Sequence, residues 1–333
     1  MRWIILYYLF SSFMASGQKV EITGKREGVS FRGLSVVSGK VLWVSGSKGT
    51  IGRSRDGGRS FEWMIVPGYE NREFRDVEAF DAQTAVIMAV AEPAVILRTE
   101  NGGKAWKVVY FNDTPGMFLD ALEFWNDESG IVIGDPVKGR FFVARTFDGG
   151  NNWRPLAFDK LPPADSAEAC FAASGTNVRA LKRDEACFIS GGSKSRFFWK
   201  NKPVVLPIVT GKETQGANSI AVWYRNRKQP LIVVAGGDFA NPASVDRNCA
   251  VSKDGGVTWS NPATAPTGYR SCVEFINPRK LITCGLNGVD ISDDEGATWK
   301  NISREGFHVC RKAKNGKAVY LAGNEKIGKL VRE

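Results

Sequence analysis

The sequence is poor in the residues on which several kinds of active site depend. It contains a single histidine, His308, which excludes a zinc site built on several histidines. A Ser-His-Asp triad would have to use this one residue as its base. The chain has no Cys-x-x-Cys pair and no dinucleotide-binding glycine motif after a strand. We therefore expect no redox cofactor and no metal.

Long apolar runs are absent after the first residues of the chain. Arg2 precedes an apolar run that ends at Met14, and Ala15-Ser16-Gly17 places small residues at a cleavage position. This is the pattern of a secretory signal, and the run is shorter than the roughly 20 apolar residues that a membrane span needs. We expect 1–17 to be a cleaved signal peptide and 18–333 to be a single exported domain, periplasmic or extracellular.

Acidic residues are fewer than basic ones. The chain holds 45 Lys and Arg against 35 Asp and Glu, a formal charge of +10. This balance favours acidic partners. The cations are scattered along the chain and the protein is expected to be exported, so nucleic acid is not an expected partner. We expect a monomer with no membrane span.

One octapeptide recurs five times, with the pattern Ser/Thr-x-Asp/Asn-x-Gly-x-x-Trp/Phe. Its copies begin at Ser54, Thr99, Thr146, Ser252 and Ser292. The third position holds Asp56, Asn101, Asp148, Asp254 and Asp294, and the eighth holds Phe61, Trp106, Trp153, Trp259 and Trp299. Asp and Gly suit a tight turn, and the aromatic ring can fold back over a hairpin. The copies are too alike and too evenly spread for one active site, so we expect a structural role.

The intervals between the copies predict a propeller. They are 45, 47, 106 and 40 residues, and the long interval holds two units, one of which lacks the octapeptide near 187–199. Alternating apolar segments open each unit: 34–37, 77–80, 121–124, 170–173, 220–223, 272–276 and 307–313. Seven units of about 45 residues predict an all-β, seven-bladed propeller with four antiparallel strands per blade. The alternative is a six-bladed, sialidase-like propeller with 305–333 as a tail.

The ends of the chain complete this arrangement. The last unit has three apparent strands, and Val20-Glu-Ile-Thr23 precedes the first unit. We expect 20–23 to pair with 327–331 and close the ring, which removes an exposed edge.

The octapeptide resembles the Asp-box of sialidase-type propellers. Three further segments are similar to the bacterial relatives of the photosystem II assembly and stability factor: Phe31-Arg-Gly-Leu-Ser-Val36, Phe74-Arg-Asp-Val-Glu-Ala-Phe80 and Glu168-Ala-Cys-Phe-Ala-Ala-Ser174. The resemblance covers nearly all of the chain after residue 17. It implies an exported propeller that acts as an assembly or protein-binding factor. Many bacterial members carry an oxidoreductase label, which no residue pattern here supports.

In such a fold the starts of the inner strands surround the axial mouth on the face opposite the octapeptides. The residues aligned there are Arg32, Arg75, Leu119, Glu168, Asn218, Arg270 and His308. Turns on the same face add Lys48, Glu92, Asp135, Asp238 and Glu325. We expect a ligand site formed by Arg32, Arg75, Arg270, His308, Glu168, Glu92 and Asp135, because arginine binds carboxylates in a bidentate manner. The alternative is that the arginines pair with these acids and tie blades together.

Two functions fit the pattern. The first is a non-catalytic propeller that binds a protein partner or an anionic ligand at the arginine-lined face. The second is a sialidase-type exo-glycosidase acting on an anionic sugar, with Glu92 or Asp135 as general acid and Tyr269 or Glu168 as nucleophile. The first is favoured, because a sialidase start motif is only half present in Phe31-Arg-Gly-Leu34.

Six cysteines would lie in a compartment where disulfides persist. They are Cys170, Cys187, Cys249, Cys272, Cys284 and Cys310. Hairpin register places Cys272 opposite Cys284 and allows a bridge, and Cys170 with Cys187 is a second candidate pair. The favoured interpretation is that all six are free, buried, small apolar residues.

Overall fold

The computed structural model describes residues 17–200, 202–224 and 229–332. Most of the expected signal peptide, residues 1–16, therefore lies outside the described residues. Apart from two short 3-10 helices, Phe158–Lys160 and Lys182–Asp184, the regular elements described are β-strands. The all-β prediction is confirmed. No helix among the described residues has the length and apolar character that a bilayer crossing requires.

Four of the sheets have four antiparallel strands each. The first contains β5 (Phe74–Ala79), β6 (Ala85–Ala89), β7 (Ala94–Thr99) and β8 (Lys107–Asn112). The second contains β9 (Leu119–Phe124), β10 (Gly130–Val137), β11 (Arg140–Thr146) and β12 (Arg154–Pro155). The third contains β14 (Val178–Ala180), β15 (Ala186–Ile189), β17 (Arg196–Trp199) and β18 (Lys202–Val205). The fourth contains β22 (Cys272–Phe275), β23 (Leu281–Gly285), β24 (Gly288–Ser292) and β25 (Lys300–Ser303).

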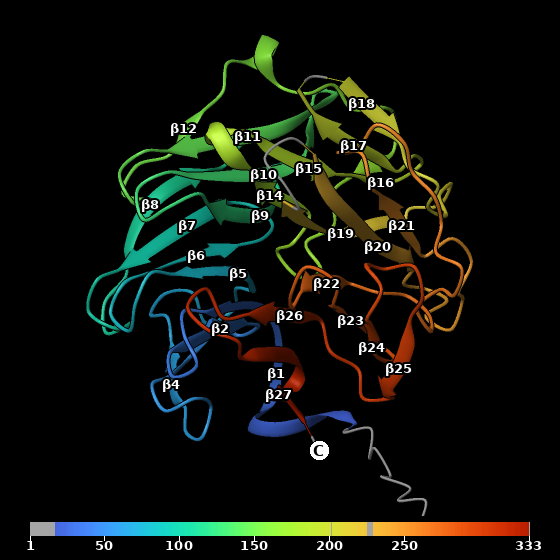
Figure 1. Ribbon diagram of the computed structural model, residues 1–333. Helices are drawn as coiled ribbons and strands as arrows, with labels where there is room; N and C mark the ends of the chain where they lie inside the picture. The colour runs from blue at the N-terminus through green and yellow to red at the C-terminus, as the bar shows by residue number, and fades with distance from the viewer. Residues whose placement is uncertain (1–16, 201, 225–228, 333) are drawn as a thin grey trace, which may run out of the picture.

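Two sheets are larger. A five-stranded sheet has the order β13 (Glu168–Ala169), β16 (Gly191–Gly192), β19 (Gln215–Tyr224), β20 (Pro230–Asp238) and β21 (Cys249–Ser252). A six-stranded sheet has the order β26 (Val309–Lys312), β27 (Val319–Arg332), β1 (Gln18–Val36), β2 (Leu42–Gly46), β3 (Thr50–Ser54) and β4 (Glu62–Ile65). Figure 1 shows the sheets arranged around a central axis.

The prediction of seven blades is wrong: the described strands form six hydrogen-bonded sheets, the blades of a six-bladed propeller. The reason is the length of β1, which runs from Gln18 to Val36 without interruption. Its first part pairs with β27 and its second part pairs with β2. The first and last predicted units therefore share one sheet. The six-blade alternative has the right number, but it treated 305–333 as a tail, whereas β26 and β27 are paired strands.

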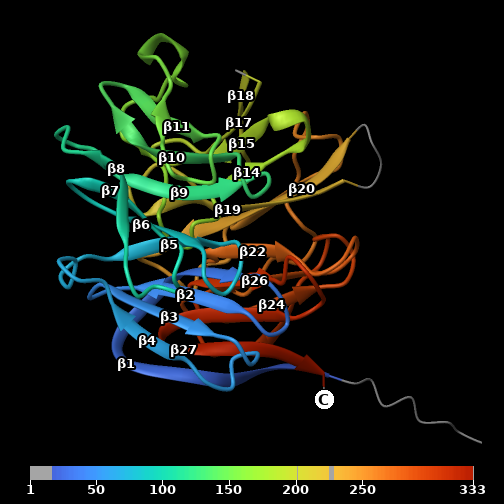
Figure 2. The ribbon, with the colours of Figure 1, turned by 90° about the vertical axis from the view of Figure 1, so that its left-hand side faces the viewer.

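The predicted closure of the ring is confirmed. Val20 pairs with Leu330, Glu21 with Lys329 and Ile22 with Gly328 in the antiparallel ladder of β1 and β27. Blue β1 and red β27 lie side by side in both views (Figures 1 and 2). The two ends of the chain thus close the propeller through main-chain hydrogen bonds.

One predicted inner strand is not a strand. Residues 170–173 follow the two-residue strand β13 as irregular chain, and β14 begins only at Val178. Cys187 consequently pairs with Arg179 rather than with Cys170. Cys272 does lie directly opposite Cys284, as the hairpin register predicts. All six cysteines are free thiols and all are buried, as the favoured interpretation expected.

The five octapeptides form turns with one common set of hydrogen bonds. In each copy the hydroxyl of the first residue donates to the side-chain oxygen of the Asp or Asn at the third position. The N–H of the glycine at the fifth position donates to that same hydroxyl. These bonds measure between 2.7 and 3.0 Å. Trp153 and Trp299 are buried, while Phe61, Trp106 and Trp259 are half-buried. Each octapeptide is thus a turn held together by its own hydroxyl, its Asp or Asn side chain and its glycine N–H.

Candidate functional site

Seven strands border the axis: β1, β5, β9, β14, β19, β22 and β26. Neighbours in this series contact one another around the ring. The axis opens on both faces of the molecule. At the starts of these strands lies a cavity of about 310 Å³, here called the Arg-lined mouth. At their ends, on the face of the octapeptides, lies a cavity of about 480 Å³, here called the octapeptide-side mouth.

Residues 170–177, here called the axial loop, separate the two mouths. From the Arg-lined mouth, Arg32 and Arg75 donate to the carbonyl oxygens of residues 173 and 172, at 3.3 and 3.5 Å. From the opposite side, Arg311 donates to the carbonyl oxygen of Gly175 at 2.9 Å. Gly175 has a φ of 62°, and a Cβ there would lie 2.3 Å from Cγ of Asp76. A side chain at this position would clash with buried Asp76, so the crossing requires glycine.

Two of the three predicted arginines converge on the Arg-lined mouth. Arg75 donates to Glu73 at 2.8 Å, and Arg32 Nε lies 3.5 Å from the other oxygen of the same carboxylate. About a quarter of each arginine side chain is exposed, 25% and 27%. The Nε atoms of both are buried and have no hydrogen-bond partner. One carboxylate therefore balances only one of the two guanidinium charges, and the mouth keeps a net positive charge and unused donors.

His308 lines the same cavity and is held neutral. Burial, followed by the positive charges of Arg32 and Arg75, lowers the pKa of His308 to about 3. Its Nε2 lies 3.3 Å from the hydroxyl of Ser30, and its Nδ1 is buried without a partner. The histidine thus adds a polar nitrogen to the mouth but no charge near neutral pH.

The wall of the Arg-lined mouth is aromatic and apolar. Phe171, Phe239 and Tyr269 pack as a row, with ring centroids 6.0 and 6.2 Å apart. Phe239 and Leu286 are exposed large hydrophobic side chains at this cavity. The site therefore combines anion-binding donors with an apolar surface that a partner side chain can cover.

The third arginine, Arg270, is not part of this mouth. Its side chain is fully buried and ion-paired with buried Asp290 at 2.5 Å. It also donates to Asn287 and to Thr267, both at 2.7 Å. This arginine is therefore part of a structural ion pair within one blade, and its partner is not one of the turn acids that the alternative expectation named.

Glu168 is also locked in structural contacts. It is buried and accepts hydrogen bonds from Arg196, from Ser190 and from the N–H of Asp165. Its position beside Arg196 (β17) ties β13 to the neighbouring sheet. Glu168 is not among the described residues that line the Arg-lined mouth.

The remaining predicted carboxylates do not reach the mouth either. Glu92 is exposed and accepts a hydrogen bond from the N–H of Gly116. Asp135 accepts one from the N–H of Cys170 at 2.8 Å, and burial raises the pKa of Asp135 to about 6. Tyr269 does reach the mouth, but its hydroxyl donates to Asn218 at 2.8 Å and burial raises its pKa. Among the described residues, the acid and the nucleophile of the glycosidase hypothesis do not meet in one cavity.

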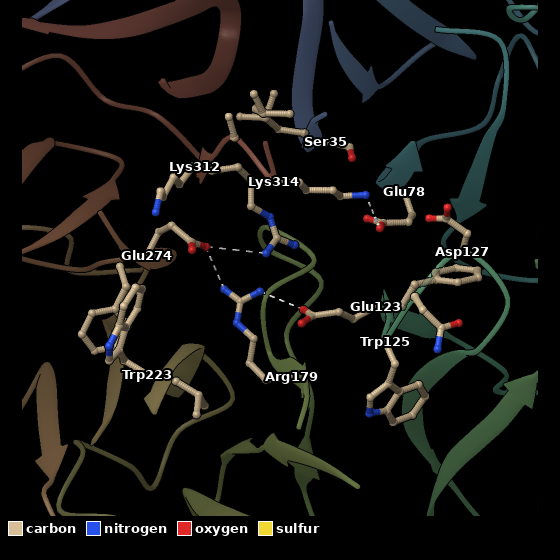
Figure 3. Close-up of a pocket in the computed structure, with 18 residues that line it drawn as sticks. Ser35, Glu78, Glu123, Trp125, Asp127, Arg179, Trp223, Glu274, Lys312 and Lys314 are labelled. Atoms are coloured by element: carbon tan, nitrogen blue, oxygen red, sulfur yellow. Dashed lines mark hydrogen bonds and ion pairs between the residues drawn. The ribbon is translucent and has the colours of Figure 1, made fainter. Parts of the chain in front are cut away.

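The octapeptide-side mouth was not predicted. Figure 3 shows it with Arg179 between Glu123 and Glu274. Arg179 donates to these carboxylates at 2.8 and 3.1 Å, and Arg311 lies 3.8 Å from the same oxygen of Glu274. On another side of the cavity, Lys314 contacts Glu78 at 2.5 Å.

The charges of this mouth are stabilised by one another. Burial alone would lower the pKa of Arg179, but Glu123 and Glu274 outweigh it and raise the value. Burial raises the pKa of Glu274, while Arg179 and Arg311 oppose this shift. The guanidinium of Arg179 is therefore permanently charged and bridges strands β9 and β22.

A sequence signal for this second mouth did exist. Five inner strands carry a charged residue directly after an apolar one at an equivalent register. These residues are Glu78, Glu123, Arg179, Glu274 and Arg311. A charge at the same place in five inner strands indicates a common location, because equivalent blade positions face the same part of the axis. Glu73 was missed as well, since it precedes β5 and belongs to no repeated pattern.

A metal centre has no support in the described part of the chain. No group of three or more His, Cys, Asp or Glu side chains lies there in an arrangement that could hold an ion. Glu73, Glu78, Glu123 and Glu274 are instead engaged by arginine or lysine.

Comparison with known proteins gives one family. The family model described as photosynthesis system II assembly factor YCF48 matches residues 18–308. No curated protein matches the chain.

Several solved structures share the fold. One, described as YCF48 bound to D1 peptide, has 15% identity and a TM-score of 0.63, with 94% of each chain covered. YCF48 from Cyanidioschyzon merolae has 15% identity and a TM-score of 0.65, covering 93% of this chain and 98% of that one. A streptogramin B lyase has 12% identity and a TM-score of 0.66, covering 95% and 98%. At such identities the likeness concerns the fold alone.

Proposed function

Because the chain belongs to the photosynthesis system II assembly factor YCF48 family, we propose that it is a protein-binding factor that acts without catalysis. Its binding surface is the Arg-lined mouth. The observation that carries this proposal is the convergence of Arg32 and Arg75 on one half-open cavity with a single counterion, Glu73. A structure described as YCF48 bound to D1 peptide supports a peptide segment as the kind of partner.

The chemistry of the mouth indicates which segment it takes. A carboxylate can accept hydrogen bonds from the unused N–H groups of Arg32 and Arg75 and balance their excess charge. An apolar side chain next to it can cover Phe239 and Leu286. We therefore propose a partner segment that presents a carboxylate beside an aromatic or aliphatic side chain.

The binding test uses matched peptides. The probes are fluorescein-labelled hexapeptides with an aromatic residue beside an aspartate, and the same peptides with asparagine in its place. We expect the aspartate peptides to bind and the asparagine peptides to bind at least about tenfold more weakly, because a charge-assisted pair to arginine is lost. Arg32→Ala with Arg75→Ala should remove this preference, as measured by fluorescence polarisation.

Arg270→Ala serves as the control for fold. This arginine occupies the aligned position of another inner strand but is a buried ion pair. Its removal should cost about 3–5 kcal/mol of stability, because it leaves Asp290 buried and unpaired. The Arg32/Arg75 double variant should melt almost like the wild type, since its bonds to the axial loop are long. Unfolding of the double variant would make these arginines structural and contradict the proposal.

We also propose that the protein is exported and that residues 1–17 are removed. The support is the order of Arg2, an apolar run and Ala15-Ser16-Gly17. Intact mass spectrometry of protein from cell fractions should find a chain that starts at Gln18 in the exported fraction. Ala15→Arg should block processing, because a small residue is required at that position. A full-length chain retained in the cytoplasm would overturn this part of the proposal.

A further inference from the structure

The octapeptide-side mouth is larger than the Arg-lined mouth and has a different chemistry. Its volume is about 480 Å³, which is within the range of sites that hold a small molecule. The axial loop separates it from the Arg-lined mouth, so a ligand here would not occupy the peptide site. The two mouths would therefore bind different ligands.

The charges of this mouth add up to zero. The acids that line it are Glu78, Glu123, Asp127 and Glu274, and the cations are Arg179, Arg311, Lys312 and Lys314. Three of the cations are already ion-paired with these glutamates. A ligand with a net charge would find no opposing net charge, so the mouth fits a neutral ligand.

The ion pairs leave acceptors and donors unused inside the cavity. Both ion pairs of Glu274 use its Oε2, and no described residue donates to its Oε1. Lys314 contacts Oε1 of Glu78, and no described residue donates to Oε2. The ammonium of Lys312 lies 5.7 Å from the ring centroid of Trp223 and has no hydrogen bond or ion pair with a described residue. Hydroxyl groups match such a surface, because each one both donates and accepts.

Aromatic rings flank the charged centre. Trp223 and Trp125 lie at opposite sides of the view in Figure 3 and are both half-buried. Trp125 is held by its indole N–H, which donates to the carbonyl oxygen of Glu185 at 2.7 Å. Flat apolar ring faces beside polar groups suit the C–H faces of a pyranose, which are apolar while its edges carry hydroxyls.

We propose that the octapeptide-side mouth is a binding site for a neutral sugar, a mono- or disaccharide. Hydroxyls of the sugar donate to Glu78 and Glu274 and accept from Lys312, while Trp223 packs against the ring. The site is independent of the peptide site at the other end of the axis.

The experiment titrates neutral sugars into the full protein. The probes are glucose, galactose, mannose, N-acetylglucosamine, maltose and cellobiose, followed by saturation-transfer NMR and calorimetry. We expect at least one to saturate with a Kd of about 1 mM or tighter, which is ordinary for a ligand of this size. Glucuronate and glucosamine, which carry a net charge, should bind more weakly than the matching neutral sugar.

Two variants and one control locate the site. Trp223→Ala and Lys312→Ala should each weaken sugar binding by about tenfold, because one removes the ring face and the other a charged donor. Lys107→Ala, at an exposed lysine of β8 that lines neither mouth, should leave sugar binding unchanged. Thermal melting shows whether each variant is folded, and Lys312→Ala keeps the test valid if Trp223→Ala unfolds. The proposal is overturned if no neutral sugar saturates, if a charged sugar binds better, or if Lys312→Ala binds like the wild type.

Discussion

At the scale of single residues, the two mouths show how burial decides the role of a charge. Arg32, Arg75 and Arg270 occupy aligned positions in the sequence, yet only the first two face a cavity. Asp290, on β24 of the same blade, binds Arg270 in a buried ion pair and so removes it from the site. The sequence predicts which arginines begin inner strands, but not which of them have a buried carboxylate nearby, because the partner comes from a different strand.

His308 gives a prediction of pH dependence. The pKa of its folded state, about 3, lies below the ordinary value of 6.5. The unfolded chain therefore binds a proton that the folded protein does not, and stability falls as pH decreases from 6.5 towards 3. His308→Gln should reduce this loss by up to about 1.4 kcal/mol per pH unit. Urea unfolding of both proteins at several pH values measures the difference, in which the contributions of the other acids cancel.

Identical acid sensitivity in both proteins would contradict a neutral His308. The outcome also matters for the proposed function. If this histidine instead kept its ordinary pKa near 6.5, acidification through that pH would add a third positive charge to the Arg-lined mouth and strengthen aspartate binding.

The octapeptide aromatics give a second prediction at this scale. Trp153 is only 6% exposed and meets Phe124 edge to face at 5.8 Å, whereas Trp106 is half-buried. Trp153→Ala should cost about 3–5 kcal/mol, and Trp106→Ala distinctly less, because less apolar surface is lost. Thermal or urea unfolding compares the two. Equal losses, or no loss in Trp153→Ala, would count against burial as the function of the eighth position.

At the scale of elements, the octapeptide turns also join neighbouring blades. The second turn glycine of each copy has a positive φ, and in the four copies after the first it faces the preceding sheet. A Cβ on Gly256 would lie 2.4 Å from Phe197 of β17, and one on Gly296 would lie 3.3 Å from Val233 of β20. The turn is thus a contact between blades as well as a hairpin.

The two glycines form a matched pair of variants. Both have nearly the same φ, 90° and 87°. Gly296→Ala should cost about 1–2 kcal/mol, the price of a left-handed backbone for a residue with a Cβ. Gly256→Ala should cost about 2–4 kcal/mol, because overpacking against Phe197 adds to it. Equal unfolding free energies for the two variants would show that the contact between blades contributes nothing.

The elements also show where sequence reasoning works and where it stops. Alternating apolar residues correctly located the inner strands β1, β5, β9, β19, β22 and β26. The strand predicted at 170–173 is wrong. The apolar residues there pack inside the axial channel, where Phe171 contacts the rings of the mouth, and they do not pair in a sheet. Alternation of apolar and polar residues indicates that one side of a segment is buried. It does not distinguish a strand from a loop that packs inside a channel.

At the scale of the whole molecule, repeat length gave the propeller but not its number of blades. Seven units of sequence are present, yet β1 and β27 are long enough to join the first and last into one sheet. Between Gly24 and Ser30, β1 continues beside β27 through backbone pairing, although the register of the two strands shifts there. No residue pattern distinguishes that from a boundary between blades.

Whole-molecule organisation also separates the two proposed activities. One axis carries a positively charged mouth with aromatic walls at one end and a charge-balanced mouth at the other. The axial loop is held from both sides by arginine, through Arg32 and Arg75 on one face and Arg311 on the other. A peptide and a sugar would thus bind on opposite faces without contact.

The most direct measurement of the central claim is NMR of arginine side chains labelled with ¹⁵N. The aspartate hexapeptide is titrated into wild type and into the Arg32→Ala and Arg75→Ala single variants, which assign the two Nε–H signals. We expect these two signals to shift on binding, while the signals of Arg179 and Arg311 stay in place, because only Arg32 and Arg75 line the mouth that the carboxylate enters. Saturable peptide binding that moves the arginines of the octapeptide-side mouth, and leaves Arg32 and Arg75 unshifted, would contradict it.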